Sequence, residues 1–306
     1  MSSTKLKAKC SGVRKMPSGA YAMNLRVVTW NAEGMFAPAL HRTPGDSPFK
    51  SRRTRRAGTS DAIAVVRKLD ADIITVPEFG IVDELPLSTR SELANMGYRL
   101  FEFPYDDEYR PPIEMAILTR LPVVSHKTYR LGEHRSVGSV VVQAGQAQLR
   151  VVAVHLDDKK ESTRLSETED LVGIANSEKR PVLMMGDFNA MHYDDWFARL
   201  VQSALFGVLV RAMPKGYLRY VLERLVEMGK GEVVAYIKRH STLRDLDPGL
   251  SRTITAKQHG LEWIPALRLA KIDWVFASAE IAMKEYKIVS DVGSDHRPVQ
   301  VTIHVT

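Results

Sequence analysis

The segment Pro181-Val-Leu-Met-Met-Gly-Asp187-Phe-Asn189 joins a short apolar run to an acid and an amide. Runs of this length and composition are typical of buried strands. The same unit recurs at 25–30, 72–76 and 149–154, where apolar runs lead into Asn31, Pro77-Glu78 and His155. The sequence therefore predicts buried strands at 25–30, 72–76, 149–154 and 181–185 that carry polar side chains at or just beyond their ends.

Helical patterns alternate with these strands. Residues 61–69 place Ile63, Val66 and Leu69 on one face, and residues 161–176 repeat the helical spacing. Further strands are predicted at 98–103, 114–119, 138–143, 272–277 and 299–305. Interleaved helices and strands indicate an α/β or α+β sandwich with a mixed sheet. Residues 194–240 are predicted to form two or three additional helices as an insertion.

Composition restricts the class of protein without deciding it. The chain has 306 residues, of which 44% are hydrophobic and 26% charged, as in ordinary globular proteins. The one cysteine, Cys10, excludes both a disulfide within the chain and a cysteine zinc site. The net charge of +7 favours a polyanionic partner, either nucleic acid or an anionic membrane surface.

The N-terminal residues carry no apolar stretch of the signal-peptide type. The longest apolar run elsewhere, 200–210, is too short to span a bilayer. We therefore expect a basic, disordered segment at 1–22, a single domain at 23–306, a monomer and a cytoplasmic location.

Eight polar residues near strand ends could share one site. A single such residue usually serves a turn or a helix cap, but eight of compatible chemistry favour a site. Carboxylates and an amide are oxygen ligands that suit Mg²⁺ or Mn²⁺ rather than zinc. A further Asp can activate water, and an imidazole beside an Asp can bind a phosphoryl oxygen. This inventory predicts metal-assisted hydrolysis of a phosphate ester. The residues are Asn31, Glu78, His155, Asp187, Asn189, Asp273, Asp295 and His296.

Ordered motifs make a family resemblance specific. They are Thr29-Trp-Asn31, Pro77-Glu78, Gly186-Asp-Phe-Asn-Ala190, Lys271-Ile-Asp-Trp-Val-Phe276 and Ser294-Asp-His-Arg-Pro-Val299. In this order they resemble the endonuclease/exonuclease/phosphatase superfamily over about residues 25–305. The resemblance implies the DNase I-like fold, a four-layer α/β sandwich of two packed mixed β-sheets flanked by helices.

The resemblance also implies a role for each position. Glu78 would be the principal ligand of one or two Mg²⁺ or Mn²⁺ ions, assisted by Asn31 and Asp295. Asp187 would orient and activate water, and Asn189 would hold that water or a phosphate oxygen. His296, oriented by Asp273, would contact the phosphate from one side and His155 from the other.

Two features qualify the resemblance. Val154-His-Leu-Asp157 resembles the branch that includes DNase I, sphingomyelinases and deadenylases, rather than the exonuclease III-like branch, which has a tyrosine motif nearby. Pro77 stands where many members have Gln before the metal-binding Glu. That difference bears on how Glu78 is supported, because residues behind a ligand orient it.

A basic cluster after the first strand favours nucleic acid as the substrate, and a DNA endonuclease in particular. Arginine side chains grip phosphates, although such clusters also occur as solvated loops. Tyr109 and Arg110 lie in a second segment that could reach substrate or simply form an exposed loop. The predicted substrate-binding residues are Arg52, Arg53, Arg55, Arg56, Tyr109 and Arg110.

Two other functions remain open. The apolar run 205–210, followed by Arg211, Lys215 and Arg219, could lie on a membrane and would suit a lipid or small-molecule phosphodiesterase or phosphatase. The same helices could instead pack on the sandwich as a cap. A non-catalytic binding module would show losses among the eight site positions, and the sequence has none.

Overall fold

The computed structural model describes residues 23–32, 34–36, 59–80, 85–103, 114–132, 135–254, 270–290 and 293–305. The predicted segment 1–22 and the six predicted substrate-binding residues lie outside these ranges. They are Arg52, Arg53, Arg55, Arg56, Tyr109 and Arg110.

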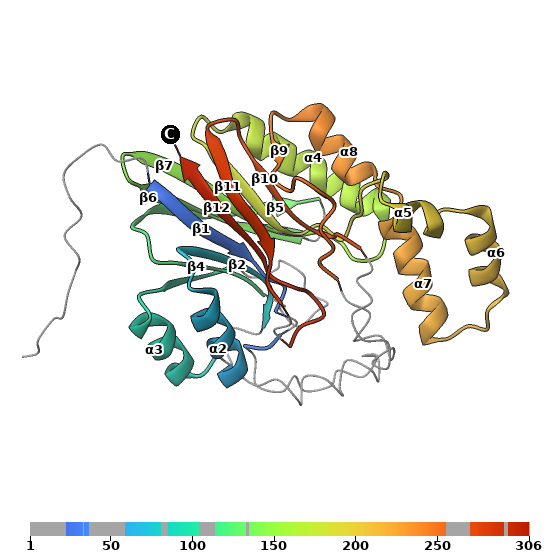
Figure 1. Ribbon diagram of the computed structural model, residues 1–306, viewed down its shortest axis with the longest axis horizontal. Coiled ribbons are helices and arrows are strands. Elements are labelled where there is room, and N and C mark those ends of the chain that lie inside the picture. Colours follow the sequence, from blue (N-terminus) through green and yellow to red (C-terminus); the bar gives the residue numbers. More distant parts are fainter. Residues whose placement is uncertain are drawn as a thin grey trace, which may run out of the picture.

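Two six-stranded sheets pack face to face (Figure 1). The first has the order β11-β12-β1-β2-β4-β3 and the second the order β5-β6-β7-β8-β10-β9. Each sheet contains one parallel pair, β1–β2 in the first and β7–β8 in the second, and its other pairs are antiparallel. These two mixed sheets confirm the predicted α/β sandwich.

The strands of the first sheet are β1 (Met23–Thr29), β2 (Ile73–Gly80), β3 (Arg99–Phe103), β4 (Glu114–Thr119), β11 (Ile281–Ile288) and β12 (Val299–Val305). Those of the second are β5 (Val123–Leu131), β6 (Arg135–Ala144), β7 (Ala147–His155), β8 (Val182–Asp187), β9 (Arg244–Asp245) and β10 (Asp273–Ala277). All nine strands predicted from the sequence are present, with ends shifted by a few residues.

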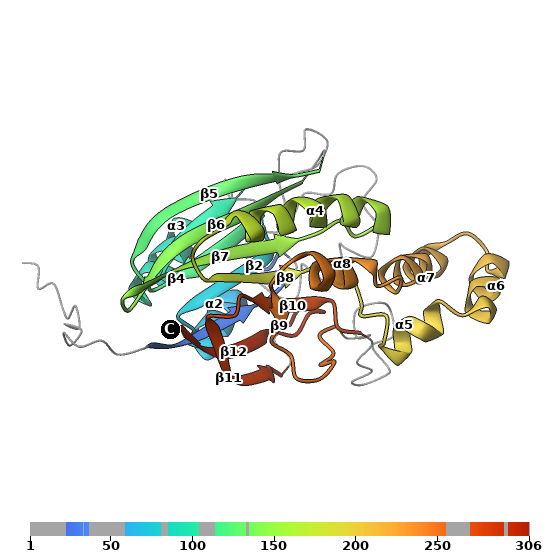
Figure 2. The ribbon, with the colours of Figure 1, turned by 90° about the horizontal axis from the view of Figure 1, so that it is seen from above.

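Helices cover the outer faces of both sheets. On the first sheet lie α2 (Thr59–Leu69) and α3 (Leu87–Asn95), and on the second lie α4 (Glu161–Ser177) and α8 (Glu232–His240) (Figures 1 and 2). The order of layers is therefore helix, sheet, sheet, helix. None of the helices in the described ranges is long and apolar enough to cross a membrane.

Alternation along the central strands creates two cores. Leu25, Val27 and Ile73 face the space between the sheets, whereas Val28 and Ile74 face α2 and α3. Successive strand residues point to opposite faces, so a continuous apolar run is what a strand buried on both faces requires. This explains why the apolar runs identified these strands.

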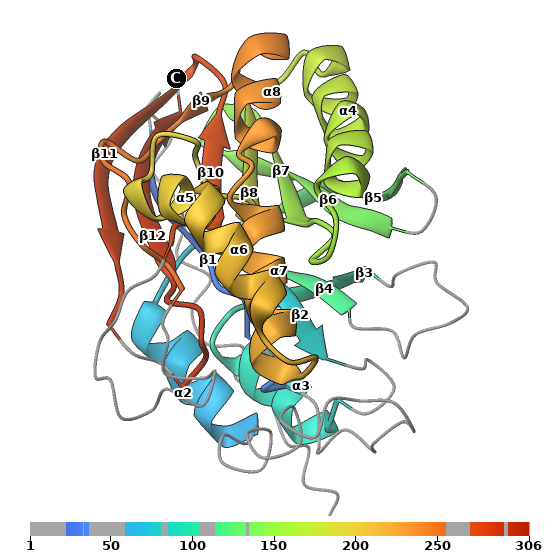
Figure 3. The same ribbon diagram turned by 90° about the vertical axis from the view of Figure 1, so that its right-hand side faces the viewer.

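The insertion contains four helices, so the prediction of two or three was wrong. They are α5 (Trp196–Val201), α6 (Ala204–Ala212), α7 (Tyr217–Met228) and α8. The apolar run 200–210 is divided because the Ser203 hydroxyl accepts a hydrogen bond from the Phe206 backbone N–H and caps a new helix. The helices α5 to α7 extend away from the sandwich (Figures 1 and 2). Helix α8 instead packs beside α4 (Figure 3).

Contact between the two sheets predicts the effect of a small substitution. A Cβ added at Gly138 in β6 would lie 2.0 Å from the ring of Phe103 in β3, whereas one added at Gly173 in α4 would meet nothing within 4 Å. We expect Gly138→Ala to lower the free energy of unfolding by about 1–3 kcal/mol through overpacking. Gly173→Ala should raise it by roughly 0.5–1 kcal/mol, because Gly weakens a helix interior. Urea unfolding of both variants measures the difference. Equal stability of Gly138→Ala and the wild type would contradict this sheet packing.

Candidate active site

Three neighbouring strands align one histidine and two acids. In the second sheet, His155 at the end of β7 pairs with Asp187 at the end of β8, and Asp187 pairs with Asp273 at the start of β10. Directly paired residues of adjacent strands project to the same side of a sheet. The register therefore places all three side chains in one row, and each is at most 5% exposed.

The first sheet contributes Asn31 and Glu78. Backbone hydrogen bonds continue past the end of β1, from Ala32 N to Pro77 O at 3.0 Å and from Gly34 N to Glu78 O at 2.7 Å. Pro77 lies where the pairing of β2 with β4 shifts register, and this position requires no N–H from it. Glu78 itself has a φ of 50°, a left-handed conformation that costs about 1–2 kcal/mol in a residue with a side chain. Strain of this kind is concentrated at functional sites.

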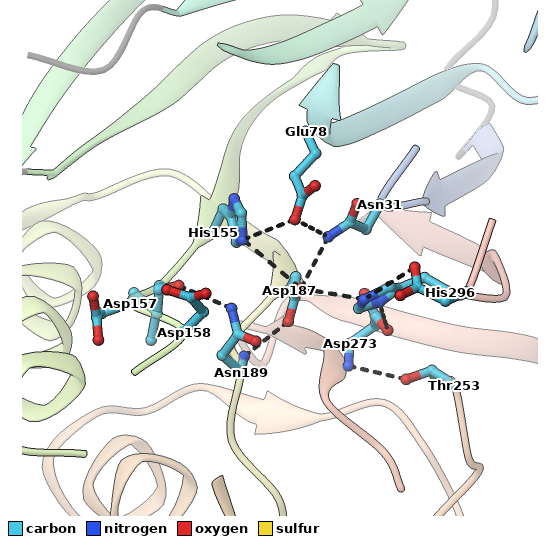
Figure 4. Close-up of polar contacts among 12 residues, drawn as sticks. Asn31, Glu78, His155, Asp157, Asp158, Asp187, Asn189, Thr253, Asp273 and His296 are labelled. Carbon is cyan, nitrogen blue, oxygen red and sulfur yellow. Dashed lines mark hydrogen bonds and ion pairs between the residues drawn. The ribbon is translucent and has the colours of Figure 1, made fainter. Parts of the chain in front are cut away.

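The Asn31 amide links the two sheets. Its Nδ2 donates to Glu78 Oε1 at 3.2 Å and to Asp187 Oδ2 at 3.0 Å (Figure 4). The predicted ligand Glu78 is thus supported by an amide from the neighbouring strand, despite the absence of the Gln that often precedes it in the family.

The turn after β8 fixes the Asp187 carboxylate. Asn189 has a φ of 49°, and its backbone N–H donates to Asp187 Oδ1 at 2.8 Å. The Asn189 Nδ2 donates to the Leu156 carbonyl at 3.0 Å, which joins this turn to the segment after His155. Gly186 is required before the turn because an added Cβ would lie 1.9 Å from the Val154 carbonyl oxygen.

His296 lies opposite His155 across Asp187 (Figure 4). Its Nδ1 is 2.8 Å from Asp273 Oδ2, and its Nε2 is 3.6 Å from Asp187 Oδ2 and 3.9 Å from Asp295 Oδ1. Burial opposes the charged form, but the carboxylates of Asp273, Asp187 and Asp295 raise the pKa of His296 well above its ordinary value. His296 is therefore held as a cation.

His155 has the opposite charge state. Its Nε2 is 3.7 Å from Glu78 Oε1 and 3.9 Å from Asp187 Oδ2. Burial, followed by the positive charge of Arg135, lowers the pKa of His155 to about 4, so the ring is neutral. Burial also raises the pKa of Asp187 to about 7. The site thus contains a neutral imidazole, a charged one and an acid that titrates near neutrality.

The residues can hold a divalent metal ion. Glu78, Asn31 and Asp295 offer the oxygen donors that hard cations prefer, and the Glu78 side chain is 26% exposed. Ligand atoms of Asp187, Asp273 and His296 also lie within 4.8 Å of one another. However, His296 Nδ1 already pairs with Asp273 Oδ2, and all three of these residues are buried. We therefore favour the set that contains Glu78.

All eight predicted site residues lie in one connected network. Their support includes residues that the sequence did not single out. The Thr253 hydroxyl accepts hydrogen bonds from the backbone N–H groups of Ile272 and Asp273, each at 3.2 Å. Arg135 donates to the His155 carbonyl at 3.3 Å. Neither residue follows an apolar strand run, so the signal that identified the eight does not apply to them.

Ser294 could have been identified from its motif. Its hydroxyl donates to the Asn31 carbonyl at 2.7 Å and accepts from the His296 backbone N–H at 3.1 Å. It belongs to the Ser294-Asp-His-Arg-Pro-Val299 motif of the family resemblance, but the motif alone does not predict its role. The hydroxyl ties the loop that carries Asp295 and His296 to the end of β1.

Comparison with known proteins identifies the family of the chain. Residues 28–296 match the model of the Endonuclease/Exonuclease/phosphatase family. The chain therefore belongs to this family. Its wider superfamily consists of metal-dependent phosphoesterases. No curated protein matches the chain. Its assignment to the histidine-containing branch stays a prediction.

Solved structures share the fold at low sequence identity. An endonuclease/exonuclease/phosphatase from Bacteroides vulgatus is 16% identical, with a TM-score of 0.61 over 93% of this chain and 100% of that one. The human Nocturnin catalytic domain with bound sulfate is 16% identical, with a TM-score of 0.59 over 94% and 97%. ANGEL2, a 2′,3′-cyclic phosphatase in complex with adenosine-2′,3′-vanadate, is 13% identical, with a TM-score of 0.57 over 93% and 96%.

The favoured ligand set predicts how a metal ion affects stability. At a hundred times its dissociation constant, Mn²⁺ or Mg²⁺ should stabilise the wild type by about 2.7 kcal/mol, measured as a higher thermal unfolding midpoint. Glu78→Gln should lose most of this gain, whereas Glu169→Gln, an exposed position on α4, should keep it. A gain that persists in Glu78→Gln but disappears in Asp273→Asn would instead locate the ion at the alternative set.

Proposed function

We propose that this chain is a Mg²⁺- or Mn²⁺-dependent nuclease that cleaves phosphodiester bonds of nucleic acid. Among nucleases, we propose a DNA endonuclease. The observation that carries this proposal is the position of the Asp187 carboxylate between two histidines, with its Oδ2 3.9 Å from His155 Nε2 and 3.6 Å from His296 Nε2. A base that titrates near pH 7 is suited to take a proton from water, and a cation beside it is suited to a phosphate oxygen.

Each residue then has a defined task. Asp187, fixed by Asn31 and the Asn189 N–H, orients the attacking water and accepts its proton. His296 donates from Nε2 to a phosphate oxygen, while Asp273 holds its Nδ1. Neutral His155 contacts the phosphate from the opposite side. A divalent ion bound at Glu78 supplies positive charge that neutralises the phosphate.

Nucleic acid is the substrate that the charge of the chain favours. The net charge of +7 suits a polyanion, and the basic segment at 50–56 follows the strand that leads into Asn31. Two structural neighbours hold ligands of related chemistry, namely sulfate in Nocturnin and adenosine-2′,3′-vanadate in ANGEL2. A tetrahedral anion and a nucleoside with a phosphate analogue are both consistent with a phosphodiester site.

Nicking of supercoiled plasmid tests the proposed function. The wild type should nick the plasmid with Mg²⁺ or Mn²⁺ and stop when EDTA is added. Asp187→Asn should lower the rate by about 10²–10⁴-fold, because it keeps the shape but removes the base. Asp170→Asn, an exposed position on α4, should leave the rate unchanged. Inertness of the wild type on every form of DNA and RNA would refute the nuclease, and turnover lost in Asp187→Asn would exclude a non-catalytic binding module.

A second candidate function, hydrolysis of lipid phosphoesters, is favoured by the surface of α6. Leu205, Val208 and Leu209 lie at helical spacing on one face and are 71%, 60% and 56% exposed. Arg211 and Lys215 follow directly and are also exposed. An apolar stripe next to basic side chains is typical of a helix that lies in an anionic membrane surface.

Flotation with anionic phospholipid vesicles tests this candidate. The wild type should float with the vesicles, and Leu205→Ser with Leu209→Ser should abolish flotation because the apolar stripe is lost. Leu87→Ser, at a leucine on α3 that is 82% exposed, provides the control and should float normally. A wild type that stays at the bottom of the gradient would remove the reason for a lipid substrate.

A further inference from the structure

Helix α7 is fixed against the segment that follows His155. The Arg224 guanidinium donates to the Asp158 carbonyl at 3.0 Å and forms an ion pair with the Asp158 carboxylate at 2.9 Å. The Glu227 carboxylate accepts from the Glu161 backbone N–H at 3.0 Å. These contacts make one rigid wall from the start of α4 and one face of α7.

Two adjoining hollows of about 490 and 250 Å³ lie along this wall. Both are lined by Tyr220 and Glu223, so together they form one groove along α7. Six basic side chains face two glutamates in it. The basic residues are Lys159, Lys160, Lys215, Arg219, Arg224 and Lys230.

The groove retains positive charge after its internal ion pairs are counted. Glu223 pairs with Arg219 at 2.8 Å, and Glu227 pairs with Lys230 at 2.5 Å. These pairs neutralise both glutamates. Lys159, Lys160 and Lys215 are exposed, and within the described part of the chain no acid lies close enough to pair with their ammonium groups. The groove therefore attracts an extended anion rather than a neutral ligand.

Tyr220 adds an aromatic surface in the middle of the groove. Its side chain is 44% exposed, and the Arg224 guanidinium lies 5.8 Å from the ring centre. An exposed ring beside a guanidinium offers a surface on which an unpaired base can stack. A base within a duplex has its faces covered by its neighbours, so this feature favours a single strand.

The groove begins close to the active site. Leu156, whose carbonyl accepts from Asn189, directly follows His155, and Lys159 is four residues beyond His155. Four residues span at most about 14 Å between Cα atoms. The twelve residues of α7 extend the surface by roughly a further 18 Å. A strand several nucleotides long could therefore contact both regions at once.

We propose that this groove binds a single-stranded segment of the nucleic acid whose phosphodiester lies in the active site. The inference rests on the proposed nuclease function and specifies its substrate. Lys159, Lys160 and Lys215 contact the phosphates, and Tyr220 stacks on a base. Affinity for a single strand then depends on length beyond the few nucleotides that the active site holds.

Binding without catalysis separates this inference from the nuclease proposal. Fluorescence anisotropy with a labelled 20-nucleotide single-stranded DNA in EDTA measures the groove independently of turnover. The triple variant Lys159→Gln, Lys160→Gln and Lys215→Gln should weaken binding at least tenfold and flatten the salt dependence by about two units, at roughly 0.7 per phosphate contact. Tyr220→Ala should weaken it by about fivefold to a hundredfold, the range expected for one stacked base.

Matched variants control for general charge and folding. The triple control variant Lys179→Gln, Lys284→Gln and Lys287→Gln removes three exposed lysines that do not line the groove and should bind as the wild type does. Thermal unfolding of each variant confirms that it is folded.

Three results bear on the proposals separately. Equal affinity of the triple variant and the wild type, or a wild type that prefers duplex to single strand, overturns the groove. Groove-dependent binding by a protein that cleaves no nucleic acid supports the groove and overturns the nuclease. Cleavage by the wild type, together with unchanged affinity in the triple variant, supports the nuclease and overturns the groove.

Discussion

The Asn31 amide is the contact on which the site depends, because it joins the two sheets where their central strands end. It donates to Glu78 in the first sheet and to Asp187 in the second. Each carboxylate is set by its own strand, and only the packing of sheet on sheet brings the two together. The bond to Asp187 is buried, where an unsatisfied partner costs about 1–3 kcal/mol. The relative position of the sheets and the geometry of the site are thus one property of the fold.

Gathering acids in this way has an electrostatic consequence. Asp187 and Asp273 are almost completely buried side by side, and Glu78 and Asp295 lie at the rim. Burial opposes the charge of Asp187, and the imidazolium of His296 supplies one positive charge among these four acids. A divalent cation is the complementary charge for such a site, and it would also offset the negative charge of a bound phosphate. His155 does not add to this compensation, because burial and the positive charge of Arg135 keep its ring neutral.

The elements that could be predicted from the sequence are those whose burial requires a recognisable pattern of apolar residues. A strand buried on both faces, such as β8, needs an unbroken apolar run, and the polar residues that follow such a run are conspicuous in the sequence. The edge strand β5 is largely exposed, the edge strand β11 is partly exposed, and neither carries such a run, while α3 has no apolar stripe, so these elements were not predicted. Thr253 could not be predicted either, because its hydroxyl accepts hydrogen bonds from two backbone N–H groups that approach it only in the folded chain.

The insertion is coupled to the site by its own small core. Met191, two residues after Asn189, and Ile272, beside Asp273, pack with Leu225 and Met228 of α7. The Met191 backbone N–H also donates to the Met228 carbonyl at 2.8 Å. A surface on α7 therefore keeps a fixed position relative to the reacting groups, as recognition of an extended substrate requires. The predicted site residues lie at the strand ends and in the loops beside them, whereas α5 to α7 supply a separate surface attached to the same strands.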